Sequence, residues 1–156
     1  MKKILITLIT IIILIMIGIT VIRFWPKAEQ QEVKIINRID EYGYILEENE
    51  TKIHQKYFEQ LIDVLSSEEI DEEAYAELVV KLFISDFYNL DNKVTKNDVG
   101  GIQYIHPAAK DNMVLKAKDT IYKYIENNID NTRTEKLPIV ISVEIEGVQV
   151  IKFKYG

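Results

Sequence analysis

The most uniform feature of the hydrophobic pattern is an apolar run near the N-terminus. Ile4–Ile22 holds 19 residues without a charged side chain, and no face of the run is polar. At about 1.5 Å per residue a helix of this length spans about 28 Å, close to the ~30 Å hydrocarbon core of a bilayer. The pattern therefore predicts a transmembrane helix that contacts membrane lipid through residues 4–22.

Basic and aromatic side chains flank this run and suit the headgroup region: Lys2, Lys3, Arg23, Trp25 and Lys27. The alternative is a cleavable signal peptide, which has about 7–15 apolar residues and small residues at its cleavage site. The longer run, with no Ala-x-Ala after it, favours an uncleaved anchor formed by residues 1–27. The two lysines before the run favour a cytoplasmic N-terminus and place residues 28–156 outside the cell.

Residues 28–47 are interpreted as a juxtamembrane linker with a short extended segment. The pattern of Val33–Ile39 fits either a helix or a strand, and Tyr42–Leu46 reads as extended. Three helices are expected next, because apolar side chains then recur every three or four residues. The first covers about Thr51–Leu65, the second begins with Asp71 as its cap, and the third runs from Pro107 to about Ile125.

The pattern changes period in the last segment. Apolar and polar side chains alternate over Ile139–Ile145, which predicts a half-buried strand. Glu146 and Gly147 can turn the chain, so that Val148–Tyr155 returns as the second arm of a hairpin. Residues 48–156 are therefore predicted to form an α+β domain with three helices packed on a small antiparallel sheet. The open edge of that hairpin predicts self-association or an envelope protein partner.

Charge narrows the range of partners. The chain has a formal net charge of −6, and residues 28–156 carry all 25 acidic but only 15 of the 19 basic side chains. Such an acidic domain has little attraction for nucleic acid.

Asp86 is the most informative polar residue because it falls within the apolar stripe of the second helix. A carboxylate there must be hydrogen-bonded or shift its pKa. We interpret it as a structural carboxylate that accepts N–H groups from the turn containing Asp98, Gly100 and Gly101. A pocket acid is the alternative. With the structural role, Asp86→Ala is expected to cost about 1–3 kcal/mol of stability.

Other motifs give no catalytic, cofactor or metal site. The loop Asn89–Gly101 resembles a calcium loop, but Lys93 and Thr95 occupy two of the positions that need oxygen ligands. His54 and His106 are the only histidines, there is no cysteine, and the glycines match no phosphate-binding pattern. The sequon Asn49-Glu50-Thr51 is equally typical of a helix start.

The layout resembles membrane-anchored extracytoplasmic domains of Gram-positive bacteria with the NTF2-like (cystatin-like) cone fold. The resemblance is carried by Leu82–Leu90, Asp98–Gly101, the third helix and Ile139–Tyr155, and it covers about Glu48–Gly156. It implies a curved sheet wrapped on helices around a cavity, which the family uses for binding, assembly or occasionally catalysis. The family's four or more long strands exceed the two clear strands here, and no family active-site residue is carried over.

These observations predict a non-enzymatic, single-pass membrane protein whose extracytoplasmic α+β domain binds or scaffolds another envelope component. One alternative is an NTF2-like pocket centred on Asp86 that binds or hydrolyses a small ligand. Another is that the chain is a truncated remnant of a longer domain.

Overall fold

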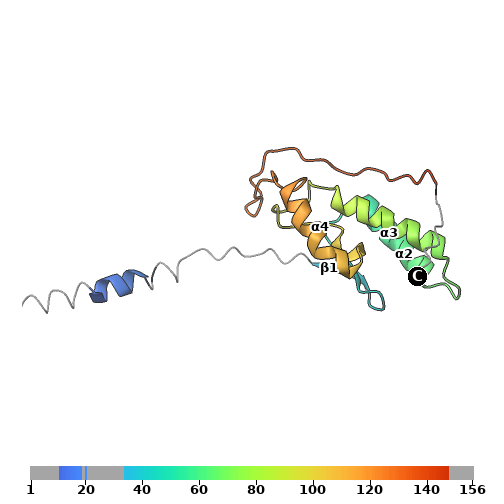
Figure 1. The fold of residues 1–156 in the computed structure, drawn as a ribbon, viewed down its shortest axis with the longest axis horizontal. Helices are drawn as coiled ribbons and strands as arrows, with labels where there is room; N and C mark the ends of the chain where they lie inside the picture. Colours follow the sequence, from blue (N-terminus) through green and yellow to red (C-terminus); the bar gives the residue numbers. More distant parts are fainter. Residues whose placement is uncertain (1–10, 19, 21–33, 148–156) are drawn as a thin grey trace, which may run out of the picture. The chain divides into compact units, whose positions relative to one another are not determined.

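The computed structural model describes residues 11–18, 20 and 34–147 (Figure 1). The chain divides into two units, Met1–Gln30 and Gln31–Gly156. In the first unit, residues 11–18 and 20 are helical. Within the described ranges no helix has both the length and the apolar character needed to cross a bilayer. The rest of the predicted anchor, with its five flanking side chains, lies outside the described residues, so the membrane span stays a prediction.

The second unit begins with a β-hairpin. β1 (Ile35–Ile39) pairs antiparallel with β2 (Tyr44–Glu47), and an irregularity in the register lies between Ile35 and Asn37. Gly43 provides the positive φ of the connecting turn. This hairpin settles the open choice for residues 33–39 in favour of a strand. It is also the sheet of the described domain, which the sequence pattern placed at the C-terminal end instead.

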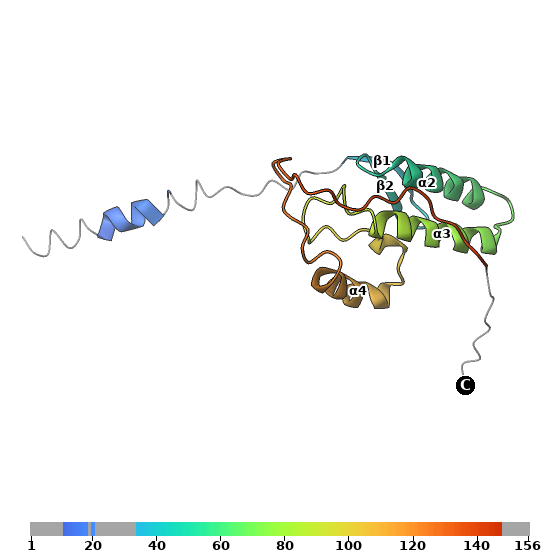
Figure 2. The ribbon, with the colours of Figure 1, turned by 90° about the horizontal axis from the view of Figure 1, so that it is seen from above.

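Two helices follow as the pattern predicts. α2 (Lys52–Leu65) begins after Thr51, whose hydroxyl accepts the N–H of His54. α3 (Glu72–Phe87) begins after Asp71, whose carboxylate accepts two N–H groups of the first turn at 3.0 Å. These side chains cap N–H groups that have no partner within the helix. A short connection lets α2 and α3 pack side by side (Figure 2).

The third predicted helix is shorter than expected. A short 3₁₀ helix, η1 (Ile102–Tyr104), precedes α4 (Pro107–Asp119), which begins with proline as predicted. The expected continuation to Ile125 is wrong: Thr120 leaves the helical region and residues 120–124 form turns. Within and directly after these turns Tyr122 and Ile125 are buried in the core, whereas Ile121 and Tyr124 are exposed.

The predicted C-terminal strand is not part of a sheet. Residues 135–147 run as an extended chain over α2 and α3 (Figures 1 and 2), without assigned strand structure. Leu137 and Val143 pack against the core, and the Leu90 N–H donates to the Pro138 carbonyl at 3.0 Å. In place of a neighbouring strand, the Tyr57 hydroxyl accepts the Val143 N–H at 3.1 Å and donates to the Val143 carbonyl at 3.3 Å. The expected return arm, Val148–Tyr155, lies outside the described residues. The observed class is α+β, as predicted, with a different sheet.

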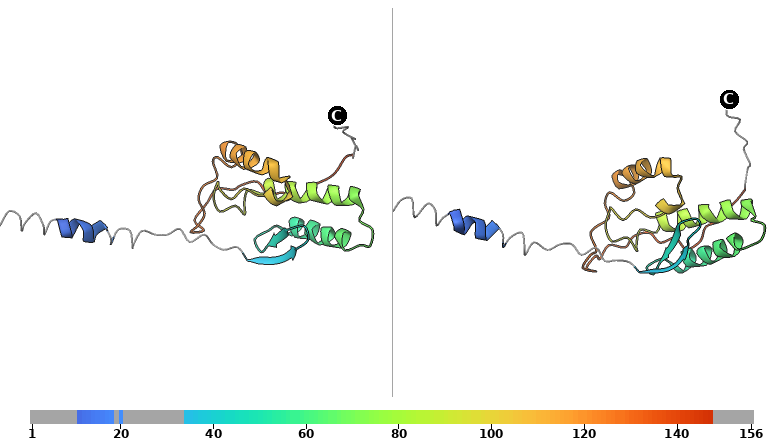
Figure 3. Two further views of the ribbon diagram at one scale, coloured as in Figure 1. Left: turned by 60° about the horizontal axis from the view of Figure 1, so that its bottom comes forward. Right: turned by 90° about the horizontal axis from the view of Figure 1, so that it is seen from below.

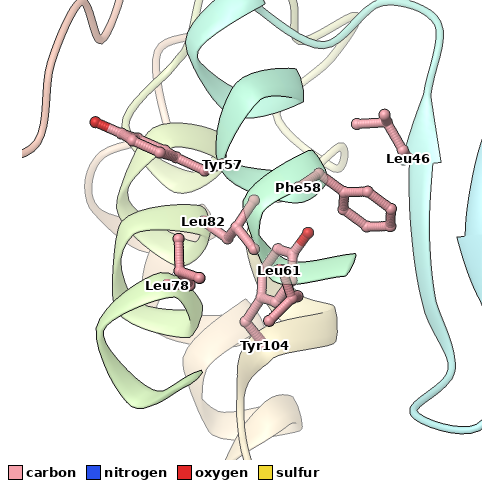
Figure 4. Close-up of a cluster of buried hydrophobic side chains, with 7 residues drawn as sticks. All are labelled: Leu46, Tyr57, Phe58, Leu61, Leu78, Leu82 and Tyr104. Carbon is pink, nitrogen blue, oxygen red and sulfur yellow. The ribbon is translucent and has the colours of Figure 1, made fainter. Parts of the chain in front are cut away.

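The core has two clusters of buried side chains. The hairpin lies beside the α2–α3 pair (Figure 3). The first cluster lies between them (Figure 4) and consists of Leu46, Tyr57, Phe58, Leu61, Leu78, Leu82 and Tyr104. The second lies at the C-terminal end of α3 and consists of Phe87, Leu90, Ala117, Tyr122 and Ile125. Each large buried apolar side chain contributes roughly 1.5–3 kcal/mol. Asp86 precedes the first residue of the second cluster, where α3 passes from one to the other.

Candidate functional site

Asp86 forms the centre of a buried polar network. Its side chain lies near the C-terminal end of α3, and the residue is only 6% exposed. One carboxylate oxygen is ion-paired with the ammonium of Lys93, and the other accepts the N–H of Gly101 at 2.5 Å. The sequence pointed to the Gly101 turn but not to Lys93, which is also buried. Both oxygens therefore have a strong donor, as a buried carboxylate requires.

The turn at Gly100 and Gly101 must approach α3 closely for this network to form. A Cβ at Gly100 would collide with the Asp86 side chain and lie 2.6 Å from its backbone oxygen. Gly101 has a φ of +75°, and a Cβ there would lie 2.7 Å from the Phe83 ring. Glycine is needed at the first position for space and at the second for both space and conformation.

Tyr122 ties this turn to the end of α3. Its hydroxyl accepts the N–H of Gly100 at 3.1 Å and donates to the Phe87 carbonyl at 2.6 Å. Burial raises the pKa of Tyr122 to about 12, so the hydroxyl keeps its proton at neutral pH. Asp98 stabilises the same loop from within: its carboxylate accepts the N–H of Val94 at 3.0 Å.

A cavity of about 220 Å³ opens beside Asp86. Five charged residues line it together with the backbone of the glycine turn: Glu47, Glu50, Asp86, Lys93 and Asp98. Four are carboxylic acids and only one is a base, so the cavity is acidic. Glu47 and Glu50 come from the end of β2 and the approach to α2, whereas Lys93 and Asp98 come from the loop after α3.

Burial and mutual repulsion change the acid groups of this cavity. Burial, followed by the nearby Asp86 carboxylate, raises the pKa of Glu50 to about 8, although Lys93 partly opposes the shift. The pKa of Glu47 is raised by burial and by Asp98 and Asp86. Burial alone would lower the pKa of Lys93, but the adjacent Asp86 and Glu50 outweigh it and raise the pKa. Glu50 therefore holds a proton through much of the neutral pH range, while Lys93 stays charged.

His54 forms a second buried polar cluster beside the first. Its ring is 0% exposed, with Nδ1 2.8 Å from the Ser85 hydroxyl and Nε2 3.3 Å from the Tyr104 hydroxyl. Because Ser85 donates its own proton to the Leu82 carbonyl at 3.1 Å, it accepts from His54 Nδ1–H. Burial lowers the pKa of His54 to about 4 and keeps the ring neutral.

The His54 cluster is structural, and the sequence did not indicate it. A histidine beside a serine can activate a nucleophile, but the Ser85 hydroxyl is fully buried and its proton is committed to a backbone carbonyl. The two residues lie on different helices, 31 positions apart, so no local motif joins them. The available signal was only that His54 lies next to the apolar stripe of its helix.

The other sequence candidates have local roles. His106 is exposed and caps α4 by accepting the N–H of Ala108. Thr51 of the sequon caps α2. In the loop that resembled a calcium site, Lys93 points to Asp86. Across residues 34–147 and the described part of the first helix, no group of three or more metal-binding side chains is placed to hold an ion.

A second surface feature lies along the extended C-terminal chain. A groove of about 400 Å³ separates this chain from the start of α2, and its lining residues are Thr51, Lys52, Ile53, Lys56, Val140 and Ile141. Residues 139–145, which we term the edge segment, expose Ile139 by 55% and Ile141 by 83%. Two lysines and several aliphatic side chains thus lie together on the surface.

Comparison with known proteins gives no match to a protein family, to a curated protein or to a solved structure. The NTF2-like resemblance therefore stays a prediction, and function is inferred from the geometry of the cavity and of the edge segment.

Proposed function

We propose that this chain is a non-enzymatic, single-pass membrane protein whose extracytoplasmic domain binds or scaffolds another envelope component. The observation that carries the proposal is the edge segment, residues 139–145. It is extended, it exposes two isoleucines, and within the described residues its backbone is hydrogen-bonded to one tyrosine side chain and not to a strand. An edge of this kind is suited to receive a strand from another chain.

The direction of the backbone groups supports this role. In an extended chain, successive residues point their N–H and C=O groups toward opposite edges. The groups of Val143 face Tyr57, so those of Ser142 and Glu144 face away from α2. Both residues are exposed, and within residues 34–147 their backbone groups have no hydrogen-bond partner. Adding a partner strand would satisfy them.

The sequence supplies the membrane part of the proposal. Residues 4–22 anchor the chain, and Lys2 and Lys3 hold the N-terminus in the cytoplasm. The edge segment then belongs to a domain on the outer side, where its partners are other envelope proteins. The NTF2-like resemblance supports the same reading, since that family uses its domains for binding and assembly.

Photo-crosslinking in the cells that make the protein tests the binding role. A benzophenone amino acid replaces Glu144 in the full-length chain, and the same group at the exposed Glu69, in the α2–α3 connection, is the control. We expect a protein adduct from position 144 and none from position 69. Ser142→Pro should abolish the adduct because proline lacks the N–H group, whereas Ser142→Ala should retain it. Equal labelling at both positions, or none at 144, would overturn the proposal.

Thiol labelling tests the topology. The chain has no cysteine, so Thr132→Cys in the exposed loop before the edge segment gives a single reporter. We expect an impermeant maleimide to label it on intact cells, and the protein to remain in the membrane pellet after a carbonate wash. Labelling only after lysis, or release by carbonate, would contradict the outward-facing anchored domain.

A pocket for a small ligand is the second candidate function, and the cavity beside Asp86 favours it. The lining has four acids and one base, so a small organic cation is the matching ligand class. Titration with n-butylammonium chloride at pH 9, above the Glu50 pKa of about 8, followed through the amide NMR signals of Gly100 and Gly101, tests this. Saturable shifts that are lost in Glu50→Gln would support the pocket, and shifts equal to those caused by potassium chloride would exclude it for this cation.

A further inference from the structure

We infer that the strand received by the edge segment is the edge segment of a second copy of this chain, paired antiparallel about a two-fold axis at Ser142. The inference rests on the proposed function, because it names the partner for the same edge. Three features of the described residues select this occupant: the register of the free backbone groups, the exposed isoleucines, and the charges of the adjoining groove.

The backbone permits a symmetric pairing in only one set of registers. The outward N–H and C=O groups belong to even-numbered residues, since Val143 faces inward to Tyr57. Hydrogen-bonded pairs between two copies must therefore join even residues to even residues. With the axis at Ser142, this residue pairs with itself, and Val140 pairs with Glu144 of the second copy. A C₂ interface is self-complementary in this way.

The same register covers the exposed apolar side chains. Directly opposite residues in an antiparallel pair place their side chains on the same face. Ile141, which is 83% exposed, then lies opposite Val143 of the second copy. Ile139, which is 55% exposed, lies opposite Ile145 of the second copy. The two copies together form one continuous aliphatic face with contributions from both edge segments.

Charge complementarity favours this occupant over an arbitrary strand. Val140 lines the groove together with Lys52 and Lys56, the two basic residues of its lining. In the proposed register Glu144 of the second copy lies opposite Val140 on the edge away from α2, within reach of the long Lys52 and Lys56 side chains across the edge segment. By symmetry the interaction occurs twice. In this acidic domain, the two lysines of the groove are thus placed near the glutamate of the second copy.

Cysteine crosslinking of the full-length chain in detergent tests the register. Opposed hydrogen-bonded residues lie about 5.5 Å apart at Cα, within the range of a disulfide. We expect Ser142→Cys to form a disulfide-linked pair on mild oxidation. Val140→Cys and Glu144→Cys should not pair when each is alone, but should pair when the two variants are mixed. The exposed Ser67→Cys, in the α2–α3 connection, is the matched control and should stay unpaired.

Charge reversal tests the groove. Glu144→Lys should weaken dimerisation measured by light scattering about five-fold, since an opposed charge pair contributes about 0.2–1 kcal/mol. Lys52→Glu combined with Lys56→Glu should weaken it similarly. Mixing the two oppositely altered chains should recover a heterodimer with nearly the original affinity, because each remaining contact again joins opposite charges.

The failures of this inference and of the proposed function are distinguishable. A monomer by light scattering, with Ser142→Cys reacting no faster than Ser67→Cys, would overturn self-pairing. If the photo-crosslinker at position 144 still captures another protein, the binding role would stand with a different partner. If the disulfide pattern appears but carbonate releases the chain from membranes, the dimer would stand and the anchored role would not.

Discussion

At the end of α3, a single carboxylate joins the helix to a loop that follows it. Asp86 accepts hydrogen bonds from the Lys93 ammonium and the Gly101 N–H, and all three residues are buried. A buried ion pair adds little net stability compared with apolar residues of similar volume, but breaking it leaves one charge uncompensated. The importance of Asp86 therefore depends on Lys93 remaining in place.

Replacing Asp86 alone should be far more damaging than replacing the pair. We expect Asp86→Leu to lower the free energy of unfolding by about 3–5 kcal/mol, because it leaves the buried Lys93 charge without its ion-pair partner. This exceeds the 1–3 kcal/mol expected from the carboxylate's hydrogen bonds alone. Urea unfolding followed by circular dichroism measures the loss. The double variant Asp86→Leu/Lys93→Met should recover most of it, and a single variant within about 1 kcal/mol of wild type would contradict the buried pair.

At the scale of elements, two extended segments each have one residue whose backbone groups are bound by a side chain. Tyr57 binds the backbone of Val143 in both directions. Gln103 does the same for Ile45, accepting its N–H at 2.8 Å and donating to its carbonyl at 3.0 Å. Single side chains can satisfy one residue of an extended chain but cannot extend a ladder. Among residues 34–147, the outer backbone groups of the edge segment consequently have no hydrogen-bond partner.

The glycine turn provides the element-scale prediction. Gly100→Ala should destabilise the domain by about 1–3 kcal/mol or more, because the new Cβ meets Asp86. Gly101→Ala should cost at least as much, since strain at positive φ adds to the contact with Phe83. Thermal unfolding by calorimetry measures both.

Two other glycines separate the causes. Gly43→Ala tests positive φ alone, because its Cβ would meet no atom within 4 Å, and should cost about 1–2 kcal/mol. Gly147→Ala has neither constraint and should stay within about 0.5 kcal/mol of wild type. If Gly100→Ala were as mild as Gly147→Ala, the close approach of the turn to α3 would be wrong.

For the whole molecule, the two buried polar clusters predict a stability maximum between acid and alkaline pH. His54 has a pKa of about 4 when folded and an ordinary value of 6.5, so the unfolded chain binds the proton first. Protonation of His54 by itself lowers stability by an amount on the order of 3 kcal/mol as pH drops from about 6.5 to 4, and above pH 4.5 the opposite contribution of Glu50 offsets much of this loss. Glu50 acts oppositely: its folded pKa of about 8 lies above 4.5, so stability falls as pH rises between these values.

Melting temperatures across pH 4 to 9 would check both effects. His54→Asn should flatten the acid side of the profile, whereas His106→Asn, at an exposed cap, should leave its shape unchanged. Glu50→Gln should flatten the alkaline side. An acid limb that persists in His54→Asn would show that other groups cause the acid sensitivity.

Local order in this domain followed from the sequence. The positions of α2 and α3, the caps at Thr51 and Asp71, and the burial of Asp86 depend on residues within a few turns of one another. Helical periodicity and capping report such short-range relations directly. The end of α4 was missed because burial of Tyr122 and Ile125 in the second core cluster overrode a continuing helical pattern.

Only the tertiary structure decided which segments meet. Alternation over Ile139–Ile145 correctly indicated an extended chain, yet a period of two does not specify a partner, and Tyr57 took the place of a strand. The Asp86–Lys93 pair and the His54–Ser85 contact likewise join residues whose spacing carries no local signal. Such pairings are fixed by packing and by the cost of burying unpaired polar groups, which act in space and not along the chain.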